Sequence, residues 1–271
     1  MPLSSLQTDI LRELAGHRNP ESYVAGATAL NRDGPRYSGD IDIFHDREES
    51  VAEAASDDAA ALTAAGFAVD WLRREPGFHA AVIGRNEDTM RLEWARDSDF
   101  RFFPTIPDPL FGFMLHVVDI ATNKALAAAG RREPRDVLDL LYIHDAHLPL
   151  GAVIWAAVGK DAGFCPESLI AEIRRNARYR ADDYLDLGLV EPIDPGLIAQ
   201  TFRQRLNAAE TFARAMPVGK EGLLFLDQGR PVQPDPAMLA QATEHAGRRR
   251  GHWPTSPELG SAMLDTTRPK S

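Results

Sequence analysis

The sequence predicts an α+β fold in its N-terminal part, followed by a helical C-terminal domain. The first observation is that strand-like runs with alternating apolar residues are confined to roughly the first hundred positions. The second is that apolar residues recur at helical spacing after about Pro109. The length of 271 residues allows one large domain or two ordinary ones. We therefore expect an α+β domain at residues 1–108, a helical domain at 109–247, and a loosely ordered tail at 248–271, which is rich in Pro, Ser, Thr and Arg.

The N-terminal elements can be read in order along the chain. The first 15 residues predict a short amphipathic helix that ends in the segment 16–20, and a strand at Glu21–Ala25 leads into the small-residue turn Gly26–Leu30. The run Tyr37–Phe44 alternates as a strand with one buried face. An Ala-rich helix over Glu48–Ala65 ends at Gly66. Further strands are predicted at Phe67–Arg73, Phe78–Gly84 and Thr89–Ala95, which would form a small mixed sheet with helices on one face.

The C-terminal half has a helical pattern. The predicted helices are Leu110–Ala129, Pro134–Asp145, Leu150–Val158, Pro166–Arg175 and Pro195–Ala215, with one late strand at Gly222–Leu226.

Composition places the chain among globular proteins. Apolar residues make up 44% and charged residues 26%, which argues against a disordered, fibrous or membrane protein. No apolar run approaches the ~18 residues of a spanning helix, and the first residues lack a secretion signal. The single cysteine, Cys165, excludes an internal disulfide and a thiolate zinc cluster. We therefore expect a cytoplasmic protein without a membrane partner.

The net charge of −10 argues against indiscriminate nucleic-acid binding, because such binding depends on cations that neutralise phosphates. Basic residues are nevertheless concentrated locally. The concentrations are Arg131–Arg135, Arg174–Arg180 and Arg248–Arg250, and the middle one includes a tyrosine. These segments are either solvated helix ends or contacts to a phosphate backbone.

The most informative stretch is the Gly26–Leu30 turn followed by Asp40-Ile41-Asp42. Carboxylates two residues apart on a strand point to the same face, so both can reach one cation or a pair of cations. Two such ions can hold a triphosphate and activate an attacking hydroxyl. Backbone N–H groups of Gly26, Ala27 and Thr28 would favour phosphate oxygens, and Ser38 could add a hydroxyl donor. The alternative is an ordinary Asp-x-Asp pair on a solvated strand face.

Two separated segments resemble the AbiEii/AbiGii toxin family of nucleotidyltransferases, within the polymerase-β-like superfamily. The first comprises Gly26–Leu30 and Arg36-x-Ser38-x-Asp40-Ile41-Asp42-Ile43-Phe44. The second comprises Asp119–Ala127, which holds Lys124, and Arg135–Leu140, in the family's order of a lysine-bearing helix and an Arg-Asp-x-x-Asp segment. The resemblance covers about residues 20–145.

This resemblance implies a polymerase-β-like mixed sheet and Mg²⁺-dependent transfer of a nucleotide from an NTP, an activity of the EC 2.7.7 type. Members commonly act as toxins beside an antitoxin protein, and some modify the acceptor end of tRNA. One departure is Ala27, where the family usually has a second glycine; a left-handed backbone there would be costlier than with glycine. No motif matches after about residue 150, so the acceptor is not implied by the resemblance.

A third carboxylate often completes the metal site in this superfamily. Glu93 is the candidate, because it faces away from Met90, Leu92 and Trp94 on its strand, and it could act as a base toward the acceptor hydroxyl. Asp97 and Asp99 are rivals, and a solvated strand residue is the alternative interpretation of Glu93.

Lys124 lies within an apolar helix, so it either extends to solvent or directs its charge at an anion. The resemblance favours binding of the triphosphate. Asp136 falls in the first turn of a helix that begins at Pro134, where the helix dipole already favours a carboxylate. The resemblance makes Asp136 a nucleotide-site residue that orients Lys124 or contacts the nucleotide, and Asp139 could pair with Arg135.

Other chemistry-bearing residues favour structural interpretations. His144 and His147 lack further ligands at a diagnostic spacing and are expected to be surface or capping residues. Cys165 lacks a local base. Trp71, Trp94, Trp155 and the pair Phe102-Phe103 are expected in the core.

Three functional hypotheses remain open on the sequence. The leading one is a nucleotidyltransferase toxin that modifies an RNA or tRNA end and has an antitoxin partner. The second keeps the chemistry but uses a small-molecule acceptor such as an aminoglycoside, which an acidic surface would suit, or a protein hydroxyl. The third is a catalytically silent module that binds a nucleotide.

Overall fold

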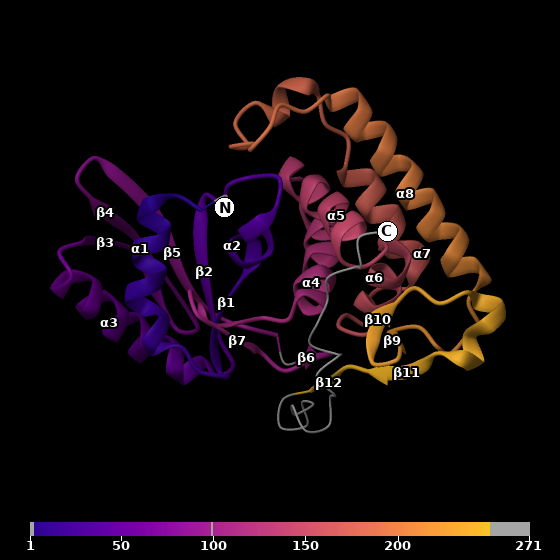
Figure 1. Cartoon of the computed structure of the whole chain (residues 1–271), viewed down its shortest axis with the longest axis horizontal. Helices are drawn as coiled ribbons and strands as arrows, with labels where there is room; N and C mark the ends of the chain where they lie inside the picture. Colours follow the sequence, from indigo (N-terminus) through magenta and orange to yellow (C-terminus); the bar gives the residue numbers. More distant parts are fainter. Residues whose placement is uncertain (1–2, 99, 250–271) are drawn as a thin grey trace. The chain divides into compact units, whose positions relative to one another are not determined.

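The computed structural model describes residues 3–98 and 100–249, which form two compact units (Figure 1). Within the described range, the first unit comprises residues 3–98 and 105–116. The second unit comprises residues 100–104 and 117–249. Each unit has its own buried apolar core.

The first unit is built on a mixed sheet with the strand order β3-β4-β5-β2-β1-β8-β7. Strand β2 lies at its centre, antiparallel to β1 and parallel to β5. This arrangement confirms the predicted mixed sheet. The strands are β1 (Ser22–Ala25), β2 (Asp40–His45), β3 (Ala68–Glu75), β4 (Phe78–Arg85), β5 (Asp88–Arg96), β7 (Ile106–Asp108) and β8 (Gly112–Met114).

Helices α1 (Ser5–Leu14) and α3 (Glu48–Ala64) cover one face of this sheet (Figure 1). The short helix α2 (Gly26–Leu30) follows β1 directly, and single 3₁₀ turns follow α1 and α2. Ile43 and Trp94 point toward α3 and are fully buried. The Trp94 indole Nε1 donates a hydrogen bond to Asp58 of α3 at 2.7 Å. The apolar sides of β2 and β5 therefore form the core of this unit.

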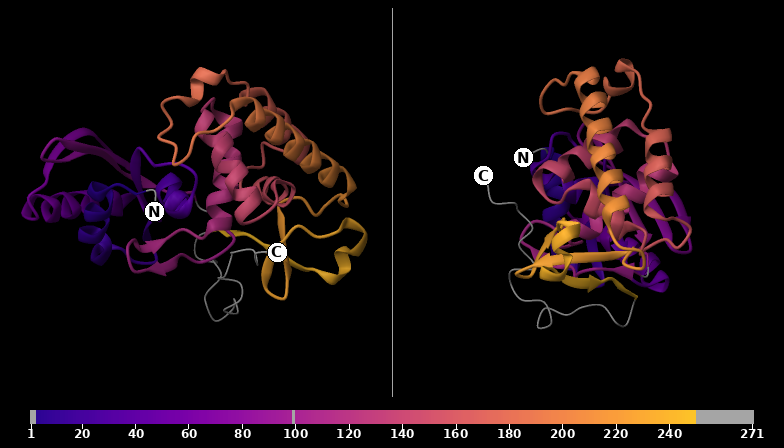
Figure 2. Two further views of the ribbon diagram at one scale, coloured as in Figure 1. Left: turned by 45° about the horizontal axis from the view of Figure 1, so that its top comes forward. Right: turned by 90° about the vertical axis from the view of Figure 1, so that its right-hand side faces the viewer.

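The second unit is mainly helical. Its helices are α4 (Val117–Gly130), α5 (Pro134–Ala146), α6 (Leu150–Ala157), α7 (Pro166–Asn176) and α8 (Pro195–Ala215). Every residue of α6 is buried, so it is the core helix. Figure 2 shows the long helix α8 and a small sheet of β9 (Leu223–Asp227), β10 (Arg230–Val232) and β11 (Thr243–Ala246). A further pair joins β6 (Phe100–Arg101) to β12 (Arg248–Arg249).

The prediction of a helix from Leu110 is wrong at its start, because α4 begins at Val117. Asp108 Oδ1 accepts the backbone N–H groups of Leu110 and Phe111 at 2.8 and 2.9 Å, which stabilises a tight turn. Gly112 then adopts φ +70°, which returns the chain as β8, antiparallel to β7. The apolar side chains that suggested helical spacing belong to this hairpin.

The structure also tests the expected late strand and the expected buried aromatic residues. The late strand is confirmed as β9, whereas β10, β11 and β12 were not predicted, because they are short and largely polar. Trp94, Trp155, Phe102 and Phe103 are buried as expected, while Trp71 is half-buried and Cys165 is exposed at the start of α7. Asp99 and the predicted tail from Arg250 onward lie outside the described residues.

Among the described residues, no single helix is both long enough and apolar enough to cross a membrane. Helices α5 and α6 pass that test of length and composition only as a pair, and the chain bends by 114° between them.

Candidate active site

Three carboxylates lie on one face of the central sheet in the first unit. Along β2 the apolar Ile41 and Ile43 are buried, while Asp40 and Asp42 alternate with them and are half-buried. This confirms the predicted alternation. Asp42 is the register partner of Glu93 in the parallel β2–β5 pair. Because register partners in adjacent strands project to the same side, Glu93 shares a face with Asp40 and Asp42.

The turn after β1 is shaped around Asp42. Gly26 has φ +66°, and a Cβ atom at this position would lie 2.0 Å from Asp42 Oδ2. Both the backbone conformation and the close approach of the carboxylate therefore require glycine. Ala27 follows within α2 and does not have a positive φ, so its side chain introduces no left-handed strain.

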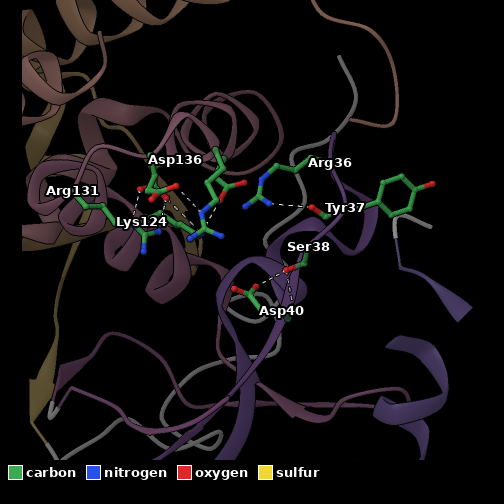
Figure 3. A network of polar contacts seen from close by, with 10 residues as sticks. Arg36, Tyr37, Ser38, Asp40, Lys124, Arg131 and Asp136 are labelled. Atoms are coloured by element: carbon green, nitrogen blue, oxygen red, sulfur yellow. Dashed lines mark hydrogen bonds and ion pairs between the residues drawn. The ribbon is translucent and has the colours of Figure 1, made fainter. Parts of the chain in front are cut away.

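The hydroxyls of Thr28 and Ser38 contact Asp40. Thr28 Oγ1 donates to the Asp40 backbone carbonyl. Ser38 Oγ lies 2.9 Å from the same carbonyl and 3.0 Å from the carboxylate Oδ1 (Figure 3). Thr28 and Ser38 are buried, so they hold the start of β2 and the Asp40 carboxylate in place.

Gln7 is a supporting residue that the sequence analysis missed. Its Nε2 donates to the Ser38 carbonyl at 3.1 Å, and its Oε1 accepts the Ser4 N–H at 2.8 Å. Ser4 and Gln7 form a reciprocal capping box at the start of α1. The Ser-x-x-Gln spacing signals such a box, but only the tertiary structure shows that the same amide anchors the loop before Asp40.

The rivals for the third carboxylate are in different surroundings. Glu93 pairs with Arg91 at 2.5 Å on the same strand face as the two aspartates. Asp97 lies beyond the end of β5, where it accepts hydrogen bonds from the Tyr23 hydroxyl and from the Ser98 N–H. Asp99 is outside the described residues. The register therefore favours Glu93 as the third acid.

The described side chains contain no group of three or more His, Cys, Asp or Glu gathered to hold a metal ion. Asp40 is engaged by Ser38, and Glu93 by Arg91. The donor set nevertheless fits Mg²⁺ in its chemistry, because Asp40, Asp42 and Glu93 offer hard oxygens on one face of adjacent strands.

Lys124 and Asp136 lie in the second unit, within a buried cluster of charges. Lys124 on α4 is only 8% exposed, so its side chain does not extend to solvent. Its Nζ is 2.7 Å from Asp139 and 3.9 Å from Asp136, both on α5. The sequence suggested Arg135 as a partner of Asp139, and the structure adds Lys124 as a close partner.

Arg131 completes this cluster (Figure 3). Its Nε and Nη2 each donate to a different oxygen of Asp136 at 2.8 Å. This forked hydrogen bond raises the pKa of Arg131 and keeps the guanidinium charged. Asp136 is buried in the first turn of α5 and contacts both cations, Arg131 through the forked hydrogen bond and Lys124 at 3.9 Å.

Two of the basic segments meet within the second unit. The Arg132 guanidinium lies 5.6 Å from the centre of the Tyr179 ring, and Arg132 also donates to the Arg178 carbonyl. Tyr179 in turn packs edge-on against Tyr184 at 6.0 Å. Burial, chiefly, raises the pKa of Tyr179 to about 12, so its hydroxyl stays protonated at neutral pH.

The histidine pair has structural contacts. His144 Nδ1 accepts the Leu150 N–H at 3.1 Å and so caps α6, and His147 packs edge-on against Tyr142. The expectation of a capping role is confirmed for His144.

A sequence model of a protein family, described as nucleotidyl transferase AbiEii toxin of a type IV toxin–antitoxin system, matches residues 9–213. The match covers most of the chain. The chain belongs to the AbiEii family of nucleotidyltransferase toxins. Both segments that carried the resemblance lie within the matched residues, and membership assigns the chain to the nucleotidyltransferases.

Solved structures agree with this assignment at the level of the fold. MenT4, a nucleotidyltransferase toxin from Mycobacterium tuberculosis H37Rv, is similar with a TM-score of 0.53 and 16% sequence identity. The similarity covers 76% of this chain and 82% of that one. No protein of curated function matches the sequence. The α+β fold with a helical C-terminal region is thus similar to the fold of a known toxin.

Proposed function

We propose that this AbiEii protein transfers a nucleotide from an NTP to the terminal hydroxyl of an RNA, with tRNA as the first candidate acceptor, in a reaction that depends on Mg²⁺. The observation that carries the proposal is the placement of Asp40, Asp42 and Glu93 on one face of adjacent strands. The catalytic domain would be the first unit, which extends the boundary expected at residue 108 to residue 116, and the second unit would be the helical domain.

Each residue has a proposed part in the reaction. Asp40, Asp42 and Glu93 would hold Mg²⁺, which supplies charge neutralisation at the phosphates and at the attacking oxygen when it is bound. Ser38 and Thr28 keep Asp40 oriented. Glu93 would accept the proton of the acceptor hydroxyl as that oxygen attacks the α-phosphorus and pyrophosphate departs.

Two sets of residues, one in each unit, have a proposed part in binding the nucleotide. The backbone N–H groups of Gly26, Ala27 and Thr28 would contact phosphate oxygens. The missing Cβ of Gly26 lets the Asp42 carboxylate approach this turn closely. Lys124 would bind the triphosphate, with Asp136 and Asp139 fixing its ammonium group. A compact cation at this position would offset the charge that builds up on the phosphates during transfer.

The choice of an RNA acceptor rests on the helical unit. Despite the overall net charge of −10, Arg132, Arg178 and Tyr179 from two basic segments are brought together there. The Arg132 guanidinium beside the Tyr179 ring is suited to contact a phosphate backbone. The family further suggests an antitoxin, so we propose that co-expression of a cognate antitoxin protein relieves growth inhibition by this chain.

The test is label transfer. The full chain is incubated with each α-³²P-labelled NTP, Mg²⁺ and total tRNA, and label is measured in the RNA, protein and small-molecule fractions. We expect label in RNA, and its loss on chelation of the metal and in the double variant Asp40→Asn, Asp42→Asn. The matched control is Asp70→Asn, because Asp70 is an exposed aspartate on β3 of the same sheet.

Different outcomes reject different parts of the proposal. Label in protein or in a small molecule alone would replace RNA by the alternative acceptors. No transfer in any fraction, together with thermal stabilisation by NTP, would indicate a silent nucleotide-binding module. Transfer that persists in the double variant would show that the metal site lies elsewhere.

A further inference from the structure

The first unit contains a second candidate site, a cavity of about 470 Å³ between α3 and one end of the β1–β2 pair. Ser22 and His45 are register partners at this end, whereas Ala25 and Asp42 pair at the other end. His45 also alternates with Phe44 and therefore faces the helix-covered side of β2, away from Asp40 and Asp42. The cavity is thus distinct from the proposed metal site, and its size is that of a small-ligand pocket.

The floor of the cavity is organised by Asp58. Its two oxygens lie 2.6 and 2.7 Å from Arg18 Nη2, and they also engage His17 Nδ1 at 2.8 Å and Trp94 Nε1 at 2.7 Å. The Arg18 and Asp58 side chains are almost completely buried, so their charges balance each other. The pair holds the Arg18 guanidinium in a fixed orientation, in which Nη2 donates to both oxygens of Asp58.

Several other polar atoms on this floor lack hydrogen-bond partners within the described part of the chain. They are Arg18 Nε and Nη1, Ser22 Oγ and His45 Nε2, all buried. Burial and then the nearby Arg18 charge lower the pKa of His45 to about 4, so its ring adds no positive charge at neutral pH. Buried donors without acceptors cost free energy. The floor is therefore suited to a ligand that brings acceptor oxygens.

The rim of the cavity carries carboxylates, whereas the floor carries hydrogen-bond donors. Glu53 and Asp57 are exposed and lie one turn apart on α3, and Glu21, which also lines the cavity, is exposed. These carboxylates disfavour an anionic ligand, since the one buried cation is already balanced by Asp58. A cationic group at the rim would be attracted by Glu53 and Asp57, whereas Glu21 already has Arg47 as a partner at 3.3 Å.

From these observations we propose that the cavity binds a ligand that carries a carbonyl or hydroxyl oxygen at one end and a guanidinium or ammonium group at the other. The oxygen accepts hydrogen bonds from Arg18 Nε and Nη1 at the floor, and the cation is held by Glu53 and Asp57 at the rim. An arginine or lysine residue in a partner protein has this chemistry, and so does a free basic amino acid.

The experiment uses the full chain, ¹⁵N-labelled, and follows amide chemical shifts. N-acetyl-L-argininamide represents a peptide segment, and L-arginine represents a free metabolite. We expect saturable shifts at Arg18, Ser22, His45 and Glu53. The uncharged N-acetyl-L-citrullinamide should bind more weakly. Tighter binding of the blocked or of the free form identifies the source, and either result supports the proposal.

Variants at the rim test the contacts without disturbing the core. The double variant Glu53→Gln, Asp57→Asn should weaken binding by roughly five- to tenfold, as expected for two exposed ion pairs. Glu49→Gln is the matched control, because Glu49 is an exposed acid on the same helix outside the lining. Ala54→Phe should block the cavity sterically. Nucleotide transfer should be unchanged in the double variant.

Three results would overturn the proposal. One is the absence of saturable shifts with both cationic probes. Another is binding of inorganic phosphate at Arg18 without binding of either cation, which would make the cavity an anion site. The third is undiminished probe binding in the Ala54→Phe variant, which would place the probe elsewhere.

Discussion

Asp42 of β2 and Glu93 of β5 are direct register partners in a parallel strand pair, so their side chains project to the same face of the central sheet. Asp97 is the other candidate for the third acid in the described part of the chain. It lies beyond the end of β5 and accepts hydrogen bonds from Tyr23 and Ser98. This relationship distinguishes two carboxylates that are only four residues apart in the sequence.

Glu93→Gln should therefore lower kcat for nucleotide transfer by about 10²- to 10³-fold, because the change removes the charge of the proposed metal ligand and base. Asp97→Asn should retain most of the activity. Single-turnover label transfer measures both, with thermal midpoints as the control for folding. Equal losses in the two variants would contradict the assignment of Glu93.

Gly26→Ala should impair both folding and transfer. The added Cβ would lie 2.0 Å from Asp42 Oδ2, so the Asp42 carboxylate must move. The alanine would also have to adopt the left-handed backbone conformation of Gly26, φ +66°. A misplacement of about 1 Å at a reacting site costs roughly 100-fold in rate. Gly66→Ala is the matched control, since Gly66 has φ +86° but open space around its Cβ position.

The Gly66→Ala variant should lose only about 1 kcal/mol of the free energy of unfolding, which is the cost of a left-handed backbone at alanine. It should keep its transfer activity. Urea denaturation and label transfer on both variants separate the two effects. Equal activity in the two variants would show that the close approach of Asp42 to the turn is unimportant.

Asp139→Asn should reduce the free energy of unfolding by about 3–5 kcal/mol, because it leaves the buried Lys124 without its nearest charge partner. Asp145→Asn is the control on the same helix. Its partner is Arg205 at 3.3 Å, and both side chains are exposed, so the loss should be below about 1 kcal/mol. Urea denaturation compares the two, and similar losses would exclude a buried ion pair at Lys124.

Acid should destabilise the fold through His45. Its pKa in the folded state is about 4, below the ordinary value of 6.5, so the ring is neutral in both states above pH 6.5. Between pH 6.5 and 4 the unfolded chain binds a proton that the folded chain does not bind, so stability falls as the pH falls. The full contribution is about 3 kcal/mol.

His45→Gln should remove this contribution. The difference in the free energy of unfolding between the wild type and the variant should then change by up to about 3 kcal/mol from pH 7 to pH 4. His79 and His245, whose pKa values are also lowered by burial, remain in both proteins and cancel in the comparison. Parallel stability curves would contradict the prediction.

The sequence alone determined the class of the fold and the family. Alternation at Ile41 and Ile43 predicts β2, and the order of the Asp40-x-Asp42 motif and Lys124 carries the family resemblance. These features are local, since side-chain periodicity and motif spacing are written along one segment of chain. The hairpin after Asp108 was not predicted from the sequence, because its turn depends on hydrogen bonds to the Asp108 side chain and on a left-handed Gly112.

Only the tertiary structure decided which residues meet. Glu93 lies beside Asp42 through strand pairing, Gln7 reaches Ser38 from a remote helix, and Lys124 is buried against Asp139. The cavity floored by Arg18 and His45 likewise joins segments with no common motif. Such contacts arise from packing between elements far apart in the chain, and the pattern within each element carries no information about its partner.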